Sequence, residues 1–480
     1  MQKIQNYING KFADPQSGTY IDNYNPATGQ VYSLIPDSDE RDVEAAVQAA
    51  KKAFPAWSGM RSEDRSALLL RLSELIGKHL ERFAVAESID NGKPVWLART
   101  VDIPRAVSNF HFYATAALHL STETHAMGDV AINYTLRTPI GIAGCISPWN
   151  LPLYLFSWKI APALASGNCV VAKPSEITPM TAYMLSEMAV EAGIPPGVLN
   201  IVHGYGTKVG KAIVAHPEIQ AISFTGGTKT GEEISRIAAP MFKKLSLELG
   251  GKNPNIIFAD CDFEKAVKTT VRSSFANQGE ICLCGSRIFI ERPLYEPFKE
   301  AFLAEVKKLK TGDPLDDGNW LGAIVSRPHM EKILHYIDLA RHEGGKILSG
   351  GNRIQAGGIH AEGYFIEPTV IEGLPYDCRT NQEEIFGPVV TLQPFDTEEE
   401  VLRYANSTSY GLAATLWTQH LTRAHRVAAR LHNGIVWVNC WLLRDLRTPF
   451  GGMKASGVGR EGGFEALHFF TEEKNICIKL

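Results

Sequence analysis

The segment 275–287 contains the residues best suited to covalent chemistry. It places Cys282 and Cys284 among Asn, Gln, Gly and Glu residues, directly before an apolar run. A thiolate in such surroundings attacks carbonyl carbon readily and is a good leaving group from an acyl carbon. A cysteine taken alone is more often a buried packing residue, so the interpretation depends on the groups that accompany it.

Two other segments offer such groups. Glu248 begins the sequence Glu-Leu-Gly-Gly-Lys-Asn-Pro, where a flexible Gly-Gly step would let its carboxylate act as a general base on water. Asn150 lies between Pro148 and Pro152 after an apolar run, and its side-chain amide could stabilise an oxyanion. The alternatives are a glutamate at a surface turn and an asparagine that forms a turn with its own backbone.

The elements that must position these residues follow a regular pattern from about residue 140. Short apolar runs alternate with helical stretches, which predicts a parallel sheet covered by helices and hence an α/β fold. The predicted strands are 142–146, 169–172, 199–202, 221–224 and 256–258, with helices at 180–192, 208–215 and 231–239. A second series from about 282 to 437 has strands at 287–290, 389–392 and 435–438. Because a chain of 480 residues is too long to fold around one hydrophobic core, two or three lobes are expected.

The outlying segments predict further elements. Asp37 and Glu40 precede a helix that places residues 43, 47, 50 and 54 on one face. Segment 62–91 predicts one long helix, capped by Ser62 and ended by Asn91-Gly92-Lys93-Pro94. Segments 127–137 and 467–480 predict extended strands outside both series. Such strands often pair with another subunit, so a homodimer or homotetramer is expected, the alternative being that they only extend the local sheet.

Composition narrows the function classes. The formal net charge is −4, so no basic excess favours nucleic acid or an anionic membrane surface. The first residues lack the apolar core of a signal peptide, and no apolar run approaches the roughly 20 residues that span a bilayer, which favours a cytoplasmic protein. Eight scattered cysteines, without metal-ligand spacing, favour neither a disulfide framework nor a zinc site.

The chain resembles the aldehyde dehydrogenase family over essentially its whole length. Besides the three segments above, it contains the family motifs Glu-Glu-Ile-Phe-Gly-Pro at 383–388 and Pro-Phe-Gly-Gly-Met-Lys at 449–454, in order. The resemblance implies that Cys282 is the nucleophile, Glu248 the base and Asn150 the oxyanion donor. The motif register favours Cys282 over Cys284. Glu280 stands where many members have Gln, and its charge is expected to raise the pKa of the Cys282 thiol.

The same resemblance implies three parts of the fold. Residues 1–118 and 140–247 would form a Rossmann-type NAD-binding domain, and residues 248–450 an α/β catalytic domain. Residues 119–139 and 466–480 would form a small β oligomerisation arm.

The cofactor site is expected where a strand meets a glycine-rich helix start. The pattern at 204–210 is one residue too long for a dinucleotide fingerprint, whereas 226–231 follows a strand and opens a helix. The resemblance points to the second segment, although Gly227 stands where many members have Ser. It implies that the residues contacting the cofactor are Trp149, Lys173, Glu176, Gly226, Gly227, Gly231, Glu384 and Phe386. Glu176 would repel a 2′-phosphate, which favours NAD over NADP.

Arginines near the expected substrate mouth suggest an acidic substrate. Arg105, Arg444 and Arg447 could bind a carboxylate through bidentate hydrogen bonds, or could be residues of surface or interface salt bridges. Their surrounding segments, 102–105, 439–441 and 444–450, resemble the 2-aminomuconic and 2-hydroxymuconic semialdehyde dehydrogenases, which implies that Arg105 and Arg444 bind carboxylate. Tyr154 and Trp158 are expected to line the channel or to pack in the core. A broad-specificity aldehyde dehydrogenase is the alternative. A thiol acceptor such as coenzyme A is less favoured because Glu248 can activate water.

Overall fold

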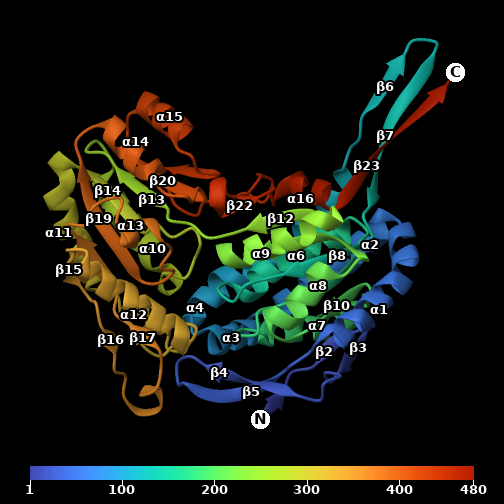
Figure 1. The fold of residues 1–480 in the computed structure, drawn as a ribbon, viewed down its shortest axis with the longest axis horizontal. Helices are drawn as coiled ribbons and strands as arrows, with labels where there is room; N and C mark the ends of the chain where they lie inside the picture. The colour runs from blue at the N-terminus through green and yellow to red at the C-terminus, as the bar shows by residue number, and fades with distance from the viewer.

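The computed structural model describes residues 1–480 and contains two large sheets, each covered by helices (Figure 1). The first sheet has the strand order β22-β12-β11-β8-β9-β10-β2-β3. Its strands are β2 (Asn6–Ile8), β3 (Lys11–Ala13), β8 (Ile142–Ile146), β9 (Cys169–Lys173), β10 (Leu199–Ile201), β11 (Ile219–Thr225), β12 (Lys244–Glu248) and β22 (Gly457–Val458). The central strands are parallel, and antiparallel strands from the two ends of the chain complete the edges.

Helices on both faces of this sheet bury its apolar residues. They are α1 (Glu40–Gly59), α2 (Ser62–Lys78), α3 (Leu80–Asn91), α5 (Ile103–Ala116), α6 (Pro152–Ala165), α7 (Met180–Ala192), α8 (Lys211–Ala215) and α9 (Thr228–Ala238). All five residues of β8 and of β9 are buried, as expected for strands that are covered on both faces. The largest hydrophobic core of the molecule, with 63 buried residues, lies here.

The second sheet has the order β15-β18-β19-β14-β13-β20-β21. Its strands are β13 (Pro254–Ile257), β14 (Arg287–Glu291), β15 (Lys346–Ser349), β18 (Thr369–Glu372), β19 (Val389–Phe395), β20 (Ala413–Trp417) and β21 (Ile435–Val438). Its main helices are α10 (Phe263–Phe275), α11 (Tyr295–Val306), α12 (Arg327–His342), α14 (Glu398–Asn406) and α15 (Leu421–Arg430). The predicted α/β fold is therefore confirmed. The boundary between the two predicted series was wrong by one strand, because the segment predicted as strand 256–258, the last of the first series, belongs to β13 of the second sheet.

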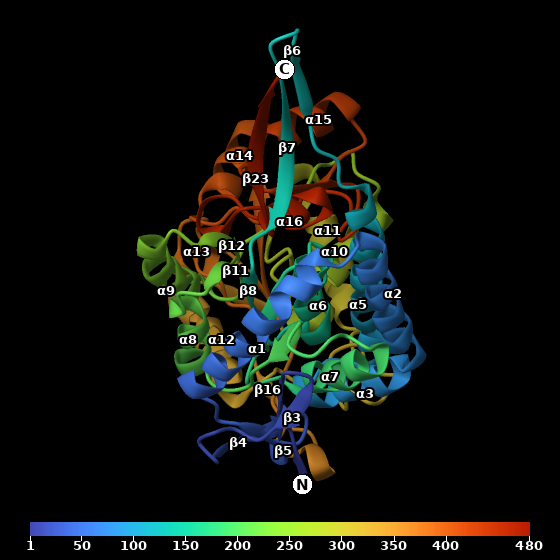
Figure 2. The same ribbon diagram turned by 90° about the vertical axis from the view of Figure 1, so that its right-hand side faces the viewer.

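A three-stranded arm projects from the body and carries the C-terminus at its tip (Figure 2). Strand β7 (Ala131–Pro139) lies between β6 (Thr124–Met127) and β23 (Thr471–Lys479), antiparallel to both. The remaining elements are short: a small sheet of β1 (Gln2–Lys3), β4 (Tyr20–Asn25) and β5 (Gln30–Pro36), the pair β16 (Arg353–Ile354) and β17 (Phe365–Ile366), and the helices α4 (Val95–Leu97), α13 (Arg379–Gln382) and α16 (Gly463–Phe469). No helix combines the length and the apolar character that a membrane crossing requires.

Three other sequence predictions about these elements were wrong. Segment 62–91 forms two helices that meet at His79, just after Gly77, a residue of weak helix propensity. Ser62 does not cap the first of them, because the N-cap is Arg61 and no side chain bonds there. Residues 467–469 are the end of α16 rather than a strand, because Leu467 and Phe470 pack into the large core.

Candidate active site

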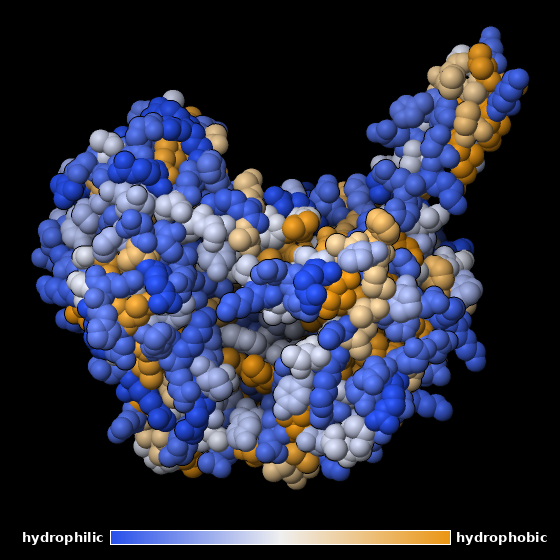
Figure 3. Space-filling view, viewed as in Figure 1, coloured by the Kyte–Doolittle hydropathy of each residue, from blue (hydrophilic) through white to orange (hydrophobic).

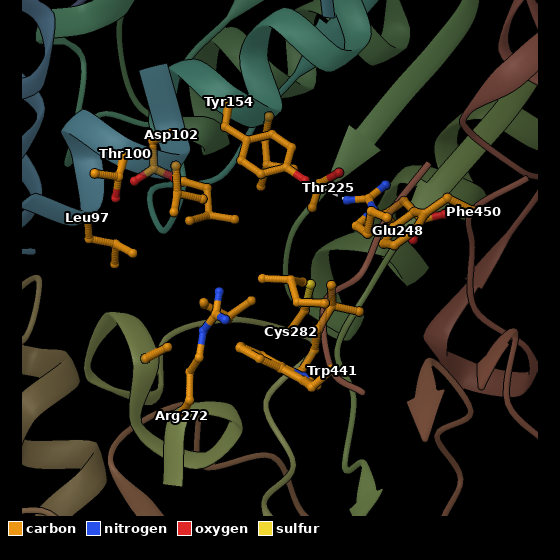
Figure 4. A pocket seen from close by; sticks show the side chains of 18 of the residues that line it. Leu97, Thr100, Asp102, Tyr154, Thr225, Glu248, Arg272, Cys282, Trp441 and Phe450 are labelled. Atoms are coloured by element: carbon orange, nitrogen blue, oxygen red, sulfur yellow. Dashed lines mark hydrogen bonds between the residues drawn. The ribbon is translucent and has the colours of Figure 1, made fainter. Parts of the chain in front are cut away.

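Cys282 lies in a cavity between the two sheets. The cavity has a volume of about 330 Å³, and 14 of its 21 lining residues are hydrophobic. Tyr154 and Arg272 reach into it from different sides, while Cys282 and Glu248 lie between them (Figure 4). Because the walls are largely apolar, the few polar groups must determine how a ligand is oriented.

The loop that carries Cys282 is fixed by an asparagine. Asn253 Nδ2 donates to the backbone oxygens of Cys282 and Cys284, at 2.7 and 2.9 Å. Cys282 is half-buried and lines the cavity, whereas Cys284 is buried and its thiol points toward the carbonyl of Ala276. The cavity is therefore open to the first thiol and not to the second.

The expected influence of Glu280 on this thiol is not found. Burial raises the pKa of Cys282, and the carboxylates of Glu248 and Glu384 add to the shift, whereas Glu280 raises the pKa of Cys284 instead. Glu280 is fully buried and accepts a hydrogen bond from the Val325 backbone N–H at 3.2 Å. Burial holds the pKa of its own carboxyl well above the usual value.

Glu248 ends strand β12 at the edge of the same cavity. Both of its carboxylate oxygens are buried without a hydrogen-bond partner. Burial, and then the charge of Glu461, raise its pKa. A carboxylate with a raised pKa and no partner is suited to accept a proton from water. Glu461 is held in turn by Lys159 at 2.7 Å and by the Ser223 hydroxyl at 3.1 Å.

Asn150 lies in the loop between β8 and α6. Its side chain is buried, and Nδ2 donates to the backbone oxygen of Glu280 at 2.9 Å. An amide nitrogen carries two hydrogens, so this bond orients the amide and leaves one N–H for another acceptor.

A second cavity, of about 190 Å³, also borders Cys282, besides the first, substrate-sized cavity of about 330 Å³. It is lined by Trp149, Asn150, Gly226, Glu384 and Phe386. The rings of Trp149 and Phe386 meet edge to face with their centres 5.3 Å apart. Glu384 is held by the Gly251 backbone N–H, which donates to its Oε1 at 2.8 Å.

A groove of about 720 Å³ continues from this cavity along the carboxyl ends of β8, β9 and β11. Its lining includes Lys173, Glu176, Gly226 and Gly227, and Lys173 Nζ lies 2.9 Å from Glu176 Oε2. Gly227 is the N-cap of α9, so the positive end of that helix opens into the groove. Gly231 does not line it: an added Cβ would lie 2.5 Å from Leu249, so this glycine allows close packing of α9.

Arg444 lines the substrate-sized cavity without a counter-ion. No carboxylate oxygen lies within 4.0 Å of its guanidinium, which lies 3.9 Å from the ring centre of Phe450 and donates to the Tyr154 hydroxyl at 2.6 Å. Arg444 therefore forms no salt bridge within the chain. The salt-bridge alternative is right for Arg447, which pairs with Asp445 at 2.6 Å on the surface.

Arg105 and Trp158 lie farther from the cavity than expected. The Arg105 guanidinium packs 5.6 Å from the ring centre of Tyr154 and has no ion-pair partner, but the residue does not line the cavity. Trp158 is buried, and its ring centre lies 5.2 Å from the guanidinium carbon of Arg444, against which it packs. The prediction that Trp158 lines the channel is wrong, whereas Tyr154 does line it.

Sequence reasoning missed three charged residues near this site. Arg272 lines the cavity and lies 5.8 Å from the ring centre of Trp441. Asp102 also lines it and pairs with the buried Lys93 at 2.8 Å. Arg272 carried no motif signal. Lys93 lies in the segment Asn91-Gly92-Lys93-Pro94, which predicts the end of a helix, so its role near the site was not recognised.

Comparisons with known proteins agree with this arrangement. The model of the "Aldehyde dehydrogenase family" matches residues 12–476. The chain is 52% identical to the 2-aminomuconic semialdehyde dehydrogenase of Mus musculus, over 99% of this chain and 98% of that one. It is 46% identical to the 2-hydroxymuconic semialdehyde dehydrogenase of Pseudomonas sp. (strain CF600), with both chains covered fully. An NAD⁺ complex of an aldehyde dehydrogenase from Bacillus cereus superimposes with a TM-score of 0.97 at 40% identity, covering 100% of this chain and 97% of that one. The chain belongs to the aldehyde dehydrogenase family.

Proposed function

We propose that this enzyme uses NAD to oxidise a semialdehyde that carries a carboxylate, of the 2-aminomuconic or 2-hydroxymuconic type, to the dicarboxylic acid. The observation that carries the proposal is the guanidinium of Arg444, which has no ion-pair partner and lines a largely apolar cavity beside Cys282. A partly desolvated arginine without a counter-ion favours an anionic ligand, and a charge-assisted bond to carboxylate contributes about 1.5–3 kcal/mol. The names of the two relatives above describe substrates of this kind.

The residues around the cavity support a covalent route. The Cys282 sulfur bonds to the aldehyde carbon, and the carbonyl oxygen takes up negative charge that the free N–H of Asn150 stabilises. The chemistry that NAD supplies when bound is acceptance of a hydride. Loss of hydride from the adduct leaves a thioester on Cys282. Glu248 then takes a proton from water, the water oxygen attacks the acyl carbon, and the C–S bond breaks to release the acid and the thiolate.

The groove fits a dinucleotide. Two of its hydroxyl oxygens, Ser147 Oγ and Thr225 Oγ1, are buried without a hydrogen-bond partner, which indicates a polar ligand. Lys173 and Glu176 would hold the adenosine ribose, and the start of α9 at Gly226 and Gly227 the pyrophosphate. Trp149, Glu384 and Phe386 would hold the nicotinamide end, next to Cys282.

The experiment is a rate comparison between two aldehydes. NADH formation is followed with 2-hydroxymuconic semialdehyde and with hexanal, for the wild type and for Arg444→Ala. The variant should lose about 100-fold in kcat/KM on the semialdehyde and less than about threefold on hexanal, because only the first carries a carboxylate. Arg447→Ala, which removes an arginine already paired with Asp445, is the matched control and should change neither rate. Equal losses of kcat/KM on both aldehydes in Arg444→Ala would contradict the proposal and favour the alternative, a broad-specificity aldehyde dehydrogenase.

The arm supports an oligomer, a homodimer or a homotetramer. The arm exposes six large apolar residues in its strands and at their ends: Met127, Val130, Ile132, Leu136, Ile478 and Leu480. Figure 3 shows hydrophobic side chains gathered along one side of the arm. Contiguous exposed apolar surface on a projecting sheet favours contact with another subunit. Ile132→Asp with Leu136→Asp, two residues on one face of β7, should lower the mass seen by sedimentation, whereas Asn475→Asp should not. An unchanged mass in the first variant would argue against this role.

The domain roles follow from the same assignment. Residues 1–118 and 140–247 supply the strands and helices around the groove and would bind NAD. Residues 248–450 supply Glu248, Cys282 and Arg444 and would form the catalytic domain.

A further inference from the structure

The loop that carries Asn150 is held from behind by a cluster of buried charges. We propose that Lys93 is a positioning residue for the oxidation of aldehydes: it fixes the backbone of Asn150, so that the side-chain amide faces the reacting carbonyl. The proposal rests on the role of Asn150 given under the proposed function. It does not depend on which aldehyde is the substrate.

The contacts of Lys93 all point to this loop or to its supports. Its ammonium donates to the backbone oxygen of Asn150 at 3.1 Å and to Asp102 Oδ2 at 2.8 Å, and lies 3.6 Å from Glu87 Oε1. The side chains of Lys93, Asp102 and Glu87 have no exposed surface. Glu87 also accepts a hydrogen bond from the backbone N–H of Leu153, at the other end of the loop, at 3.2 Å.

Local backbone geometry accounts for the position of Lys93. Helix α3 ends at Gly92, whose φ of 88° is left-handed, and an added Cβ there would lie 2.6 Å from the Ala323 carbonyl. The chain therefore turns sharply, and the Lys93 carbonyl accepts a hydrogen bond from the Ser88 hydroxyl at 2.6 Å. The Asn91-Gly92-Lys93-Pro94 segment thus ends a helix and also directs a lysine into the interior.

The front of the loop is tied to the cysteine loop. Asn150 Nδ2 donates to the Glu280 carbonyl, two residues before Cys282, and Asn277 Nδ2 donates to the Asn150 carbonyl at 3.1 Å. Lys93 and Asn277 thus hold the Asn150 backbone, while Glu280 holds its amide. The distance between the oxyanion donor and the sulfur consequently depends on the lysine.

A purely stabilising role accounts poorly for this cluster. Burying an ammonium with two carboxylates has a large desolvation cost before their attraction is counted, and an apolar cluster of the same volume is often as stable or more so. The charged groups here instead contact the backbone of the loop that carries Asn150: Lys93 donates to the Asn150 carbonyl, and Glu87 accepts from the Leu153 N–H. A displacement of about 1 Å at such a place can cost on the order of 100-fold in rate.

The test is a double-mutant cycle in the full-length enzyme. Lys93→Met alone would leave buried acids unpaired and endanger folding, so Lys93→Met is combined with Asp102→Asn, which keeps the cluster's net charge. This pair of changes is made in the wild type and in Asn150→Ala, and kcat, KM and the NAD dissociation constant are measured with hexanal and with the semialdehyde. Lys299→Met is the control, because Lys299 is likewise paired with two glutamates but lies on α11.

The expected result is a loss of at least about tenfold in kcat on both aldehydes in the wild-type background, with NAD binding within twofold. In the Asn150→Ala background the same changes should alter kcat less than twofold, because the group that Lys93 positions is absent. Equal fold-losses in the two backgrounds, or an unchanged kcat in the first, would overturn the proposal. An effect through Arg444 would differ from this one, since it would be confined to the carboxylate-bearing aldehyde.

Discussion

Cys282 borders two spaces, the substrate-sized cavity and the small cavity that opens into the groove, and these offer a ligand different groups. The substrate-sized cavity has mostly apolar walls, with Arg444 as an unpaired cation opposite Tyr154. The groove is more open and more polar, and some of its charged groups are paired within the protein, as Lys173 is with Glu176. In the first cavity recognition depends on few groups, so one substitution should change specificity strongly. In the groove recognition is spread over many contacts, so single changes should have smaller effects.

The largest effect is expected where the two cavities share a residue. Cys282→Ser should lower kcat by at least about 10⁴-fold, because the nucleophile is lost, while the NAD dissociation constant stays within twofold. Cys284→Ser, at a buried thiol that does not line the cavity, should keep kcat within about fivefold. Stopped-flow NADH formation and NAD titration measure both. Substantial turnover by Cys282→Ser would exclude the thioester route.

Removal of the base should separate the two halves of the reaction. Glu248→Gln should lower steady-state kcat about 10²–10⁴-fold, since water is no longer activated. Formation of the thioester does not need this carboxylate, so rapid mixing should still show a burst of NADH close to one equivalent per active site. A loss of the burst together with the steady-state rate would place Glu248 in the first half of the reaction instead.

The pH dependence should follow the buried groups. Burial raises the pKa values of Cys282 and of Glu248, so at neutral pH both are more protonated than their ordinary values would give. The reactive thiolate and the free base therefore become more populated as pH rises, and kcat/KM should increase between about pH 6 and pH 9. Because the Arg444 charge lowers the pKa of Cys282, the rising limb should shift to higher pH in Arg444→Ala. A rate that falls over this range would contradict this.

A smaller effect is expected in the nucleotide groove. Glu176→Gln removes the carboxylate that disfavours a 2′-phosphate, and the ratio of kcat/KM for NAD over NADP should fall about tenfold. Glu233→Gln is the matched control, because Glu233 also lines the groove but is already paired with Arg236 at 2.6 Å. An equal change in the two variants would indicate a general effect of charge rather than a contact with the ribose.

The residues that could be predicted from sequence differ from the missed ones in how far along the chain their partners lie. Cys282, Glu248 and Asn150 lie in short contiguous motifs, so a resemblance to family motifs could indicate their roles although each residue type alone left an alternative open. The alternating apolar and helical pattern predicts both sheets. Arg272 and Lys93 act through tertiary neighbours, Trp441 and the Asn150 carbonyl, that are distant in sequence. The break at His79 and the burial of Trp158 depend on packing against other elements, which periodicity alone does not encode.

The smallest effect concerns how Arg444 is held. Its guanidinium rests on the rings of Phe450 and Trp158, and a single hydrogen bond to the Tyr154 hydroxyl sets its direction. Tyr154→Phe keeps the ring but removes this bond, which contributes about 1 kcal/mol, so KM for the semialdehyde should rise about fivefold while kcat on hexanal stays unchanged. In the Arg444→Ala background the tyrosine change should have no further effect on the semialdehyde, because the two residues act as one unit. A tyrosine effect that persists without Arg444 would mean that Tyr154 contacts the substrate itself.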